Sequence, residues 1–255
     1  MDFQEEKRFE DRIVGRNAVM EALKSGRSLD SVLIARGERQ GSIGVIVARC
    51  REKGIPVKET DSRKLDAMAD NHQGVIAIAA CKEYVSLDAL FAVAESKGES
   101  PFFIVCDELE DPHNLGAILR TAEAAGAHGV VVPRRRSVGL TGAVYKSSAG
   151  AVEYVPVARV SNINEALTEM KKRGMWIYGL DMDGEDWCAT DLTGAMALVV
   201  GSEGRGVSRL VRENCDFVLS LPMSGHINSL NASVACGIVL YEAARQRKGI
   251  KAINR

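Results

Sequence analysis

Short apolar runs alternate with amphipathic stretches along the C-terminal part of the chain. The last amphipathic stretch shows the pattern clearly, because Val234, Ile238 and Tyr241 recur with helical spacing. Continuous apolar strands that alternate with helices are typical of a parallel sheet covered by helices on both faces. The pattern therefore predicts an α/β domain over residues 101–255, with strands at 102–106, 129–132, 154–157, 175–180, 197–200 and 217–221.

A smaller α/β unit is predicted over residues 13–81. No catalytic spacing occurs in it, so we interpret it as a recognition module. The charged residues 1–12 are predicted to be a mobile tail, and residues 82–100 a connection whose helix is capped by Ser86 and ended by Gly98. Within the unit, helices are expected at 17–23, 43–53 and 63–69, and strands at 31–35, 55–57 and 75–80.

The ligand site of a parallel sheet lies at the carboxyl ends of its strands, and this directs attention to three loops. In the first loop, Asn114 is predicted to cap a helix that begins at Leu115. Arg120 lies well off the apolar stripe of that helix, so it faces either solvent or a ligand. From this helix alone we favour solvent.

The second loop, residues 201–206, contains three glycines directly after a buried strand. Glycines at such a place allow a tight turn and a close approach of the backbone to a ligand. Glu203 lies inside this loop, and its carboxylate disfavours a phosphate ligand. A ligand with a cationic or amine group fits better.

The third loop follows the strand at 217–221 and carries Ser229, Asn231 and Ser233 at alternate positions. One of these residues is expected to cap the last helix, because Ser and Asn are favoured at helix N-termini. A cap requires one short polar side chain, whereas this loop supplies three. We therefore interpret the loop as part of a ligand site, with capping alone as the alternative.

Together the three loops resemble the motifs of a known family, in that family's order. The family is the SpoU (TrmH-like) branch of the SPOUT RNA methyltransferases, which methylate ribose 2′-hydroxyls using S-adenosylmethionine. Each stretch alone is a weak signal, whereas the three together are specific. The matching stretches are Asn114-Leu-Gly-Ala-Ile-Leu-Arg120, Gly201-Ser-Glu-Gly-Arg-Gly206, and Leu221-Pro-Met followed by Ser229-Leu-Asn-Ala-Ser233.

The N-terminal unit, with His72-Gln-Gly-Val75, resembles the substrate-binding domain of the same family, which is similar to ribosomal protein L30e. The resemblance implies a methyltransferase that acts on a guanosine of large-subunit (23S) ribosomal RNA. It also implies a C-terminal trefoil knot and a homodimer formed through the C-terminal domain. In such a dimer, we expect each active site to take Arg120 from one subunit and Asn231 from the other.

The resemblance also implies roles for individual residues, and no metal ion is among them. The positions that match catalytic and substrate-orienting residues are Asn114, Arg120, Glu203, Ser229 and Asn231. S-adenosylmethionine would be held around Gly201, Glu203, Gly204, Leu221, Met223, Ser229 and Leu230. RNA contacts are expected from Arg16, His72, Gln73, Arg134, Arg135 and Lys146, although a turn histidine without function and a solvated charge run are open alternatives for His72 and for the arginines.

The resemblance implies that Arg120 is the general base, and this role conflicts with the chemistry of its side chain. A guanidinium has a pKa above about 12 and stays protonated. We therefore expect Arg120 to clamp a phosphate and the developing alkoxide, while Glu203, Ser229 and Asn231 fix geometry. The residue that acts as the general base is not identified by the sequence.

Composition limits the kind of partner and the compartment. The 255 residues carry a net charge of −1, so contact with nucleic acid must come from local basic patches such as Arg134–Arg136. The six cysteines include no Cys-x-x-Cys pair, so metal and disulfide interpretations are weak. Neither a secretory signal nor a membrane span is expected, and the cytoplasm is the default location.

Three other interpretations compete with this one. A non-catalytic RNA-binding protein with the same fold would be expected to lack the polar residues of the three loops. A nucleotide-dependent oxidoreductase would need an acidic residue at a set distance after a Gly-x-Gly-x-x-Gly motif, which is missing. The same chemistry directed at transfer RNA, or a resistance-type ribosomal RNA methyltransferase, is not distinguished by the sequence.

Overall fold

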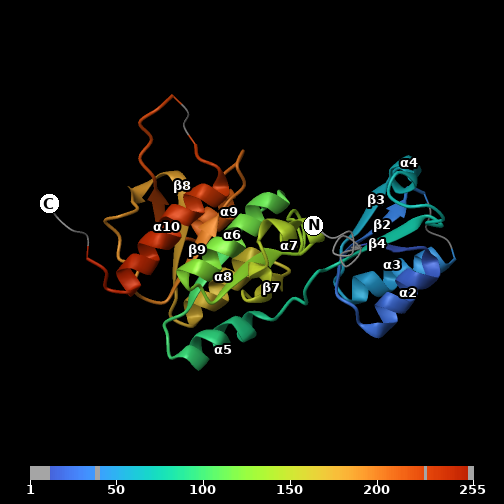
Figure 1. Ribbon diagram of the computed structural model, residues 1–255, viewed down its shortest axis with the longest axis horizontal. Coiled ribbons are helices and arrows are strands. Elements are labelled where there is room, and N and C mark those ends of the chain that lie inside the picture. Colours follow the sequence, from blue (N-terminus) through green and yellow to red (C-terminus); the bar gives the residue numbers. More distant parts are fainter. Residues whose placement is uncertain (1–11, 38–40, 227–228, 252–255) are drawn as a thin grey trace. The chain divides into compact units, whose positions relative to one another are not determined.

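The chain forms two compact units in a computed structural model that describes residues 12–37, 41–226 and 229–251 (Figure 1). One unit comprises the residues up to Glu83 together with Gly139–Ala143, and the other comprises Tyr84–Val138 with the chain from Val144 onward. The predicted mobile tail lies outside the described residues, except that Arg12 begins the first strand.

A mixed four-stranded sheet forms the centre of the N-terminal unit, in the order β1-β4-β2-β3. Strands β2 and β3 are parallel, whereas β4 runs antiparallel to both β1 and β2. One face packs Val32 and Ile34 with the buried side chains of α2 and α3, and the opposite face packs Ile76 with Leu65 of α4. The elements are β1 Arg12–Val14, α2 Arg16–Ser25, β2 Leu29–Ala35, α3 Ser42–Glu52, β3 Val57–Thr60, α4 Ser62–Asp66 and β4 Val75–Ala79.

The second unit contains the predicted parallel sheet, with six strands in the order β10-β8-β9-β5-β6-β7. Every neighbouring pair in it is parallel. The sheet strands are β5 Phe102–Cys106, β6 Gly129–Pro133, β7 Val157–Val160, β8 Trp176–Asp186, β9 Met196–Val200 and β10 Phe217–Ser220. The helices are α5 Leu87–Lys97, α6 Pro112–Ala125, α7 Gly142–Ser147, α8 Ile163–Lys172, α9 Arg209–Glu213 and α10 Ala232–Arg247, with a 3₁₀ turn at Ala151–Glu153.

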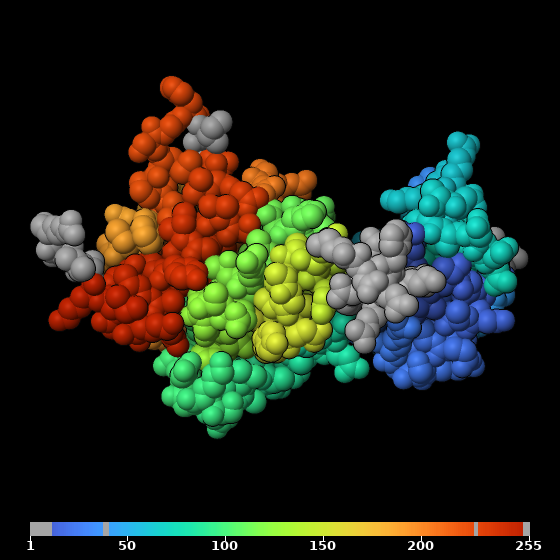
Figure 2. Space-filling model, in the orientation of Figure 1, coloured from blue at the N-terminus to red at the C-terminus, as the bar shows by residue number. Residues whose placement is uncertain are grey.

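Helices cover both faces of this sheet, and the central strands β5, β6 and β9 are accordingly apolar and buried at almost every position. Alternate residues such as Phe103 and Val105 point to one face and join a core with Leu90 of α5, Leu167 of α8 and Val211 of α9. Helices α6 and α10 pack against each other and contact β6 and β9, respectively. Figure 2 shows them side by side, α10 in red against α6 in green.

Strand β7 differs from the sequence prediction. It was expected at 154–157 and lies at 157–160 instead, after the 3₁₀ turn. Pro156 has no amide hydrogen to give to the ladder, so pairing begins at the next residue. As a consequence Tyr154 lies outside the sheet and is 79% exposed.

The segment expected to be a connection between the domains packs largely into the second unit. Its helix is bounded as predicted, since Ser86 accepts a hydrogen bond from the Ala89 amide and Gly98 adopts a left-handed conformation. Leu90 and Ala94 are buried, and Val85 forms an isolated bridge with Ala158 of β7. Residues 84–100 therefore belong to the second unit, and Leu90 joins its core.

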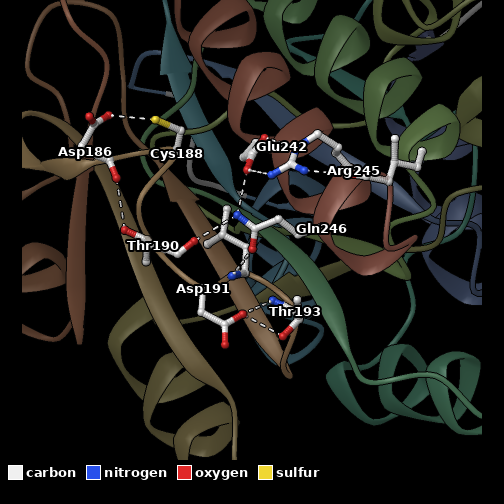
Figure 3. A network of polar contacts seen from close by, with 10 residues as sticks. Asp186, Cys188, Thr190, Asp191, Thr193, Glu242, Arg245 and Gln246 are labelled. Atoms are coloured by element: carbon white, nitrogen blue, oxygen red, sulfur yellow. Dashed lines mark hydrogen bonds and ion pairs between the residues drawn. The ribbon is translucent and has the colours of Figure 1, made fainter. Parts of the chain in front are cut away.

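The C-terminal end of α10 is fastened to the segment that crosses from β8 to β9 (Figure 3). The Gln246 side chain accepts a hydrogen bond from the Leu192 amide at 2.8 Å and donates to the Thr190 carbonyl at 3.0 Å. The buried carboxylate of Glu242 accepts two hydrogen bonds from the Arg245 guanidinium and one from the Gln246 amide. The bonds from Arg245 chiefly lower the pKa of this carboxyl group. The crossover and the last helix are therefore one connected structure.

None of the helices among the described residues combines the length and the apolar character needed to cross a membrane. The trefoil knot stays a prediction from the family resemblance.

A buried histidine links β5 and β6. The ring of His128 is 1% exposed, and its Nδ1 accepts a hydrogen bond from the Phe102 amide at 3.1 Å. Nε2 therefore carries the proton and donates to Glu99 Oε2 at 2.9 Å. Burial lowers the pKa of His128, and the bond to Glu99 opposes this only in part.

The lowered pKa predicts that the second unit loses stability as the pH falls below about 6.5, the ordinary histidine value. Unfolded chains then bind a proton that the folded ring excludes, so the unfolding free energy falls by up to about 1.4 kcal/mol per pH unit. The measurement is urea unfolding followed by tryptophan fluorescence, since Trp176 and Trp187 both lie in this unit.

His128→Asn is the matched control for this prediction, because its amide oxygen can replace Nδ1 as an acceptor and does not titrate. The pH dependence of its unfolding free energy between pH 6.5 and 5 is expected to be flatter than in the wild type. Equal slopes would show that His128 is not the source.

Candidate functional site

A pocket of about 310 Å³ lies at the carboxyl ends of β9 and β10 and beside the middle of β8. Its walls include every residue that the sequence analysis assigned to cofactor binding, namely Gly201, Glu203, Gly204, Leu221, Met223, Ser229 and Leu230. The other lining residues are Leu180, Asp181, Met182, Val200, Ser202, Arg205, Gly206, Ala232 and Ala235. Both the second and the third predicted loop therefore border one cavity.

The glycine-rich loop after β9 folds back tightly on itself. The Gly206 amide donates to the Ser202 carbonyl at 2.8 Å, and Gly206 has a φ of +65°. A Cβ on Gly201 would lie 2.0 Å from the carbonyl carbon and oxygen of Gly206. Only glycine fits at position 201, whereas a Cβ on Gly204 would meet no atom within 4 Å.

Three polar side chains from distant parts of the sequence meet at this loop. The Asn114 amide donates to Glu203 Oε1 at 2.8 Å, and the Asn231 amide donates both to the same carboxylate oxygen and to Asn114 Oδ1. Asn114 is 3% exposed, whereas Glu203 and Asn231 are exposed. The structure thus joins three of the five predicted catalytic positions in one hydrogen-bonded group, which we call the polar trio.

Asn114 reaches the trio from inside a helix, and the prediction that it caps this helix is wrong. The cap of α6 is Asp111, whose side chain accepts a hydrogen bond from the His113 amide at 2.9 Å. Pro112 follows at the first helical position, where a missing amide hydrogen causes no loss. The helix therefore begins earlier than expected, and Asn114 lies in its first turn.

Asn231 combines the two functions that the sequence analysis treated as alternatives. It caps α10, because its Oδ1 accepts hydrogen bonds from the Ser233 and Val234 amides at 3.0 and 3.2 Å and from the Ser233 hydroxyl at 2.6 Å. Its amide nitrogen is then left to donate to the polar trio. Ser229 lines the pocket, and residues 227–228 before it lie outside the described chain.

Two acidic residues that the sequence analysis did not single out connect the loops around the pocket. Buried Asp107, directly after β5, accepts a hydrogen bond from the Ser208 amide at 2.8 Å and so holds the end of the glycine-rich segment. Glu108 lies 2.9 Å from Arg136 and 4.0 Å from Arg205. Both residues directly follow a buried strand, and this position in the sequence could have marked them as candidates for the site.

Arg120 is not joined to the polar trio within one chain. It is exposed and does not line the pocket, and its side chain forms no hydrogen bond or ion pair with any residue in the described part of the chain. It follows Asn114 by six positions, which on a helix turns it by about 240° away from the trio. The sequence-based expectation that it faces solvent holds for the single chain.

The predicted RNA-binding residues fall into two groups. In the N-terminal unit, both ring nitrogens of His72 are engaged, with Asp66 and with the Gly74 amide, each at 2.9 Å. Gln73 accepts hydrogen bonds from Arg16 at its side-chain and main-chain oxygens. These contacts shape the turn at 71–74, and a role of its residues in RNA contact stays a prediction.

The second group lies in the C-terminal domain. Arg135 and Lys146 are exposed, and the main chain of Arg134 bonds to Val160. Their role in RNA contact stays a prediction. Within the described residues, no cluster of His, Cys, Asp and Glu is suited to hold a metal ion.

The pocket residues that sequence reasoning missed come from β8. Leu180, Asp181 and Met182 line the cavity, although the sequence analysis ended this strand at residue 180 and assigned no function beyond it. The polar stretch after residue 180 resembled an ordinary strand end. Only its pairing in the sheet reveals its position.

A parallel sheet covered on both faces, with a ligand pocket at its carboxyl edge and a polar trio at the pocket, defines an α/β enzyme fold with its site at the strand ends. Comparison with known proteins identifies the class. Residues 101–241 match the SpoU rRNA methylase family, and residues 12–85 match the RNA 2′-O ribose methyltransferase substrate-binding domain. The chain belongs to the SpoU family of RNA methyltransferases.

Relatives and solved structures agree with this assignment. The chain is 49% identical over 242 residues to YacO of Bacillus subtilis (strain 168), assigned to the TrmH family of tRNA/rRNA methyltransferases, with 94% of this chain and 97% of YacO covered. It resembles the SpoU methyltransferase AviRb from Streptomyces viridochromogenes in complex with AdoMet, with a TM-score of 0.61, 26% identity, and coverage of 93% and 90%. A solved RNA 2′-O ribose methyltransferase matches with a TM-score of 0.54, 27% identity, and coverage of 93% and 88%.

The close backbone contact in the glycine-rich loop predicts unequal effects of two alanine substitutions. Gly201→Ala forces a methyl group into Gly206 and is expected to lower the unfolding free energy by about 1–3 kcal/mol. Gly204→Ala, three residues away and without neighbours, is expected to change it by less than about 0.5 kcal/mol. Urea unfolding monitored by tryptophan fluorescence measures both, and equal effects would contradict the loop geometry.

Proposed function

We propose that the protein is an S-adenosylmethionine-dependent RNA 2′-O-ribose methyltransferase that acts on a guanosine of large-subunit ribosomal RNA. The observation that carries the proposal is the meeting of the polar trio with the pocket at the sheet edge. The similarity to a SpoU methyltransferase solved with AdoMet supports the choice of cofactor. The matched substrate-binding domain supports an RNA target.

The residues of the pocket fit S-adenosylmethionine. The pocket volume of about 310 Å³ is at the lower end of the range for small-molecule sites. Leu180, Leu221 and Leu230 offer apolar surface, and the carboxylates of Asp181 and Glu203 suit a cationic ligand better than a phosphate. When bound, S-adenosylmethionine supplies a methyl group that its sulfonium already activates.

Because the methyl group is already activated, the chain's own residues have two tasks: alignment and help with the proton of the ribose hydroxyl. The Glu203 carboxylate is held by the amides of Asn114 and Asn231, so its orientation is fixed before any ligand enters. Arg120 is a permanent cation, so we assign it to a phosphate and to developing charge on the attacking oxygen.

A homodimer would bring Arg120 into such a site. The helical stripe of α10 recognised in the sequence faces outward, since Val234 is 51% and Tyr241 is 57% exposed. The two residues lie seven positions apart and share one face of the helix. We propose that this face meets a second copy of the chain, in which Arg120 is directed to the partner's pocket.

The function is tested with the full chain, S-adenosylmethionine, and unmodified transcripts of 23S ribosomal RNA and of transfer RNA. Nucleoside mass spectrometry is expected to detect 2′-O-methylguanosine in the ribosomal transcript, and primer extension to locate it. Methylation of transfer RNA alone would overturn the proposed target. A methyl group on a base, or no transfer despite intact folding, would overturn the reaction.

Arg120→Lys is the control variant within this experiment, because it keeps the charge and loses the planar fork. Its affinity for S-adenosylmethionine is expected to match the wild type in calorimetry, while methyl transfer falls by orders of magnitude. Near-normal transfer would mean that a positive charge suffices.

Sharing of sites between subunits predicts activity in a hybrid of two inactive variants. An Arg120→Ala subunit paired with an Asn231→Ala subunit gives one site with both defects and one with neither. The two variants are co-expressed with different tags and the hybrid is purified through both. About half of the wild-type activity is expected for a two-fold dimer with shared sites, whereas sites built within one subunit leave the hybrid inactive.

A further inference from the structure

The pairing between strands β8 and β10 is interrupted beside the pocket and then resumes in a shifted register. Tyr178 and Gly179 pair with Phe217 and Val218 of β10, but the next β10 residue, Leu219, pairs with Glu185. Residues 180–184 therefore have no partner in β10 and form a bulge, although Leu180 still pairs with Val200 of β9. Bulges occur next to active sites, where they redirect a side chain.

Two features hold this bulge in place. Arg212 of α9 lies 3.0 Å from Asp183 Oδ1, donates to the Asp183 carbonyl at 3.0 Å, and approaches Asp181 Oδ2 at 3.6 Å. At the point of return, a Cβ on Gly184 would lie 2.4 Å from the Val218 carbonyl oxygen, so the chain needs glycine there. Specific contacts of Arg212 and the close backbone approach at Gly184 therefore fix the conformation of the bulge.

The bulge presents Asp181 to the pocket. Its side chain is 14% exposed, and the residue lines the cavity between Leu180 and Met182. Oδ1 accepts a hydrogen bond from the Met182 amide at 2.8 Å. Across from it, a Cβ on Gly206 would lie 3.3 Å from Oδ1, so the glycine-rich loop leaves room for this carboxylate.

A largely buried carboxylate is stabilised by hydrogen-bond donors. The chain offers Asp181 the Met182 amide and, at 3.6 Å, the Arg212 guanidinium, and these leave some lone pairs of its two oxygens without a donor. Glu203, the other pocket carboxylate, is already engaged with Asn114 and Asn231. Asp181 therefore has acceptor capacity for a ligand. Its apolar neighbours suit a nucleobase, and a ribose attached to that base would lie beside the carboxylate.

We propose that Asp181 accepts hydrogen bonds from the ribose hydroxyls of the nucleoside half of the cofactor, and so recognises a ribonucleoside. Carboxylates recognise ribose diols in this way in dinucleotide-binding folds. The inference rests on the proposed function, because it takes the pocket to be the cofactor site. Arg212 is a positioning residue in this arrangement, since it holds the bulge that carries Asp181.

The test compares two nucleoside probes by calorimetry on the full chain. S-adenosylhomocysteine contains both the nucleoside and the amino-acid half, whereas 5′-methylthioadenosine contains the nucleoside without the amino-acid half. Asp181→Ala is expected to weaken both probes by a similar factor, about 10- to 100-fold, as for a lost hydrogen bond to a charged group.

Asp183→Ala is the matched control. It removes the same kind of side chain from the same bulge and from the same arginine, but residue 183 does not line the pocket. Arg212 keeps its hydrogen bond to the Asp183 main-chain carbonyl and its approach to Asp181 in this variant, so the bulge stays held. The affinities for both probes are therefore expected to stay within about threefold of the wild type, less than the tenfold change that 1.4 kcal/mol produces. Tryptophan fluorescence of each variant checks that the C-terminal unit is folded.

Each remaining outcome counts against the proposal. Weakened binding of S-adenosylhomocysteine with unchanged binding of 5′-methylthioadenosine would place Asp181 at the amino-acid half. Unchanged binding of both probes to Asp181→Ala would remove it from recognition, and equal losses in Asp183→Ala would reduce its effect to the shape of the bulge. A wild-type chain that binds neither probe would overturn the proposed function itself.

Discussion

The carboxylate of Glu203 joins three loops that are far apart in the sequence. It accepts hydrogen bonds from Asn114 in the first turn of α6 and from Asn231 at the start of α10, while it belongs to the loop after β9. An ionised carboxylate only accepts hydrogen bonds, so both amides must turn their nitrogens toward it. Two helix N-termini and the glycine-rich loop are therefore fixed relative to one another by one group.

Helix α10 extends this constraint across the domain. At its first turn, the cap formed by Asn231 Oδ1 leaves only the amide nitrogen for the trio. At its last turn, Gln246 fastens the crossover between β8 and β9. A helix of 16 residues spans about 24 Å, so one rigid element connects the pocket with the segment that inserts β9 between β8 and β5.

The walls of the pocket depend on irregular backbone more than on side chains. The loop at 201–206 needs glycine because its two ends nearly touch, and β8 needs Gly184 because it rejoins the sheet against Val218. Such close approaches leave no space for a Cβ, but they bring main chain and carboxylates to the edge of the cavity. The regular sheet supplies the rigid frame on which these departures are held.

Local sequence patterns are enough to predict the class of fold and the three loops. Strands buried on both faces need apolar side chains at every position, and glycines or short polar residues at strand ends are visible without coordinates. The predicted starts of α6 and β7 were wrong because neighbouring residues fix these starts elsewhere. Asp111 and Pro112 start α6 before Asn114 can cap it, and Pro156 delays β7.

The strand order, the polar trio and the bulge of β8 depend on contacts between distant segments, which local patterns do not encode. Periodicity shows that a strand is buried but carries no information on which strand lies beside it. Asp181 becomes a pocket residue because β10 skips five positions of β8 in pairing with it, from 180 to 184. Asn231 both caps and donates because Glu203 and Asn114 happen to lie opposite its amide. These properties arise from contacts between distant segments, and such contacts exist only after the chain has folded.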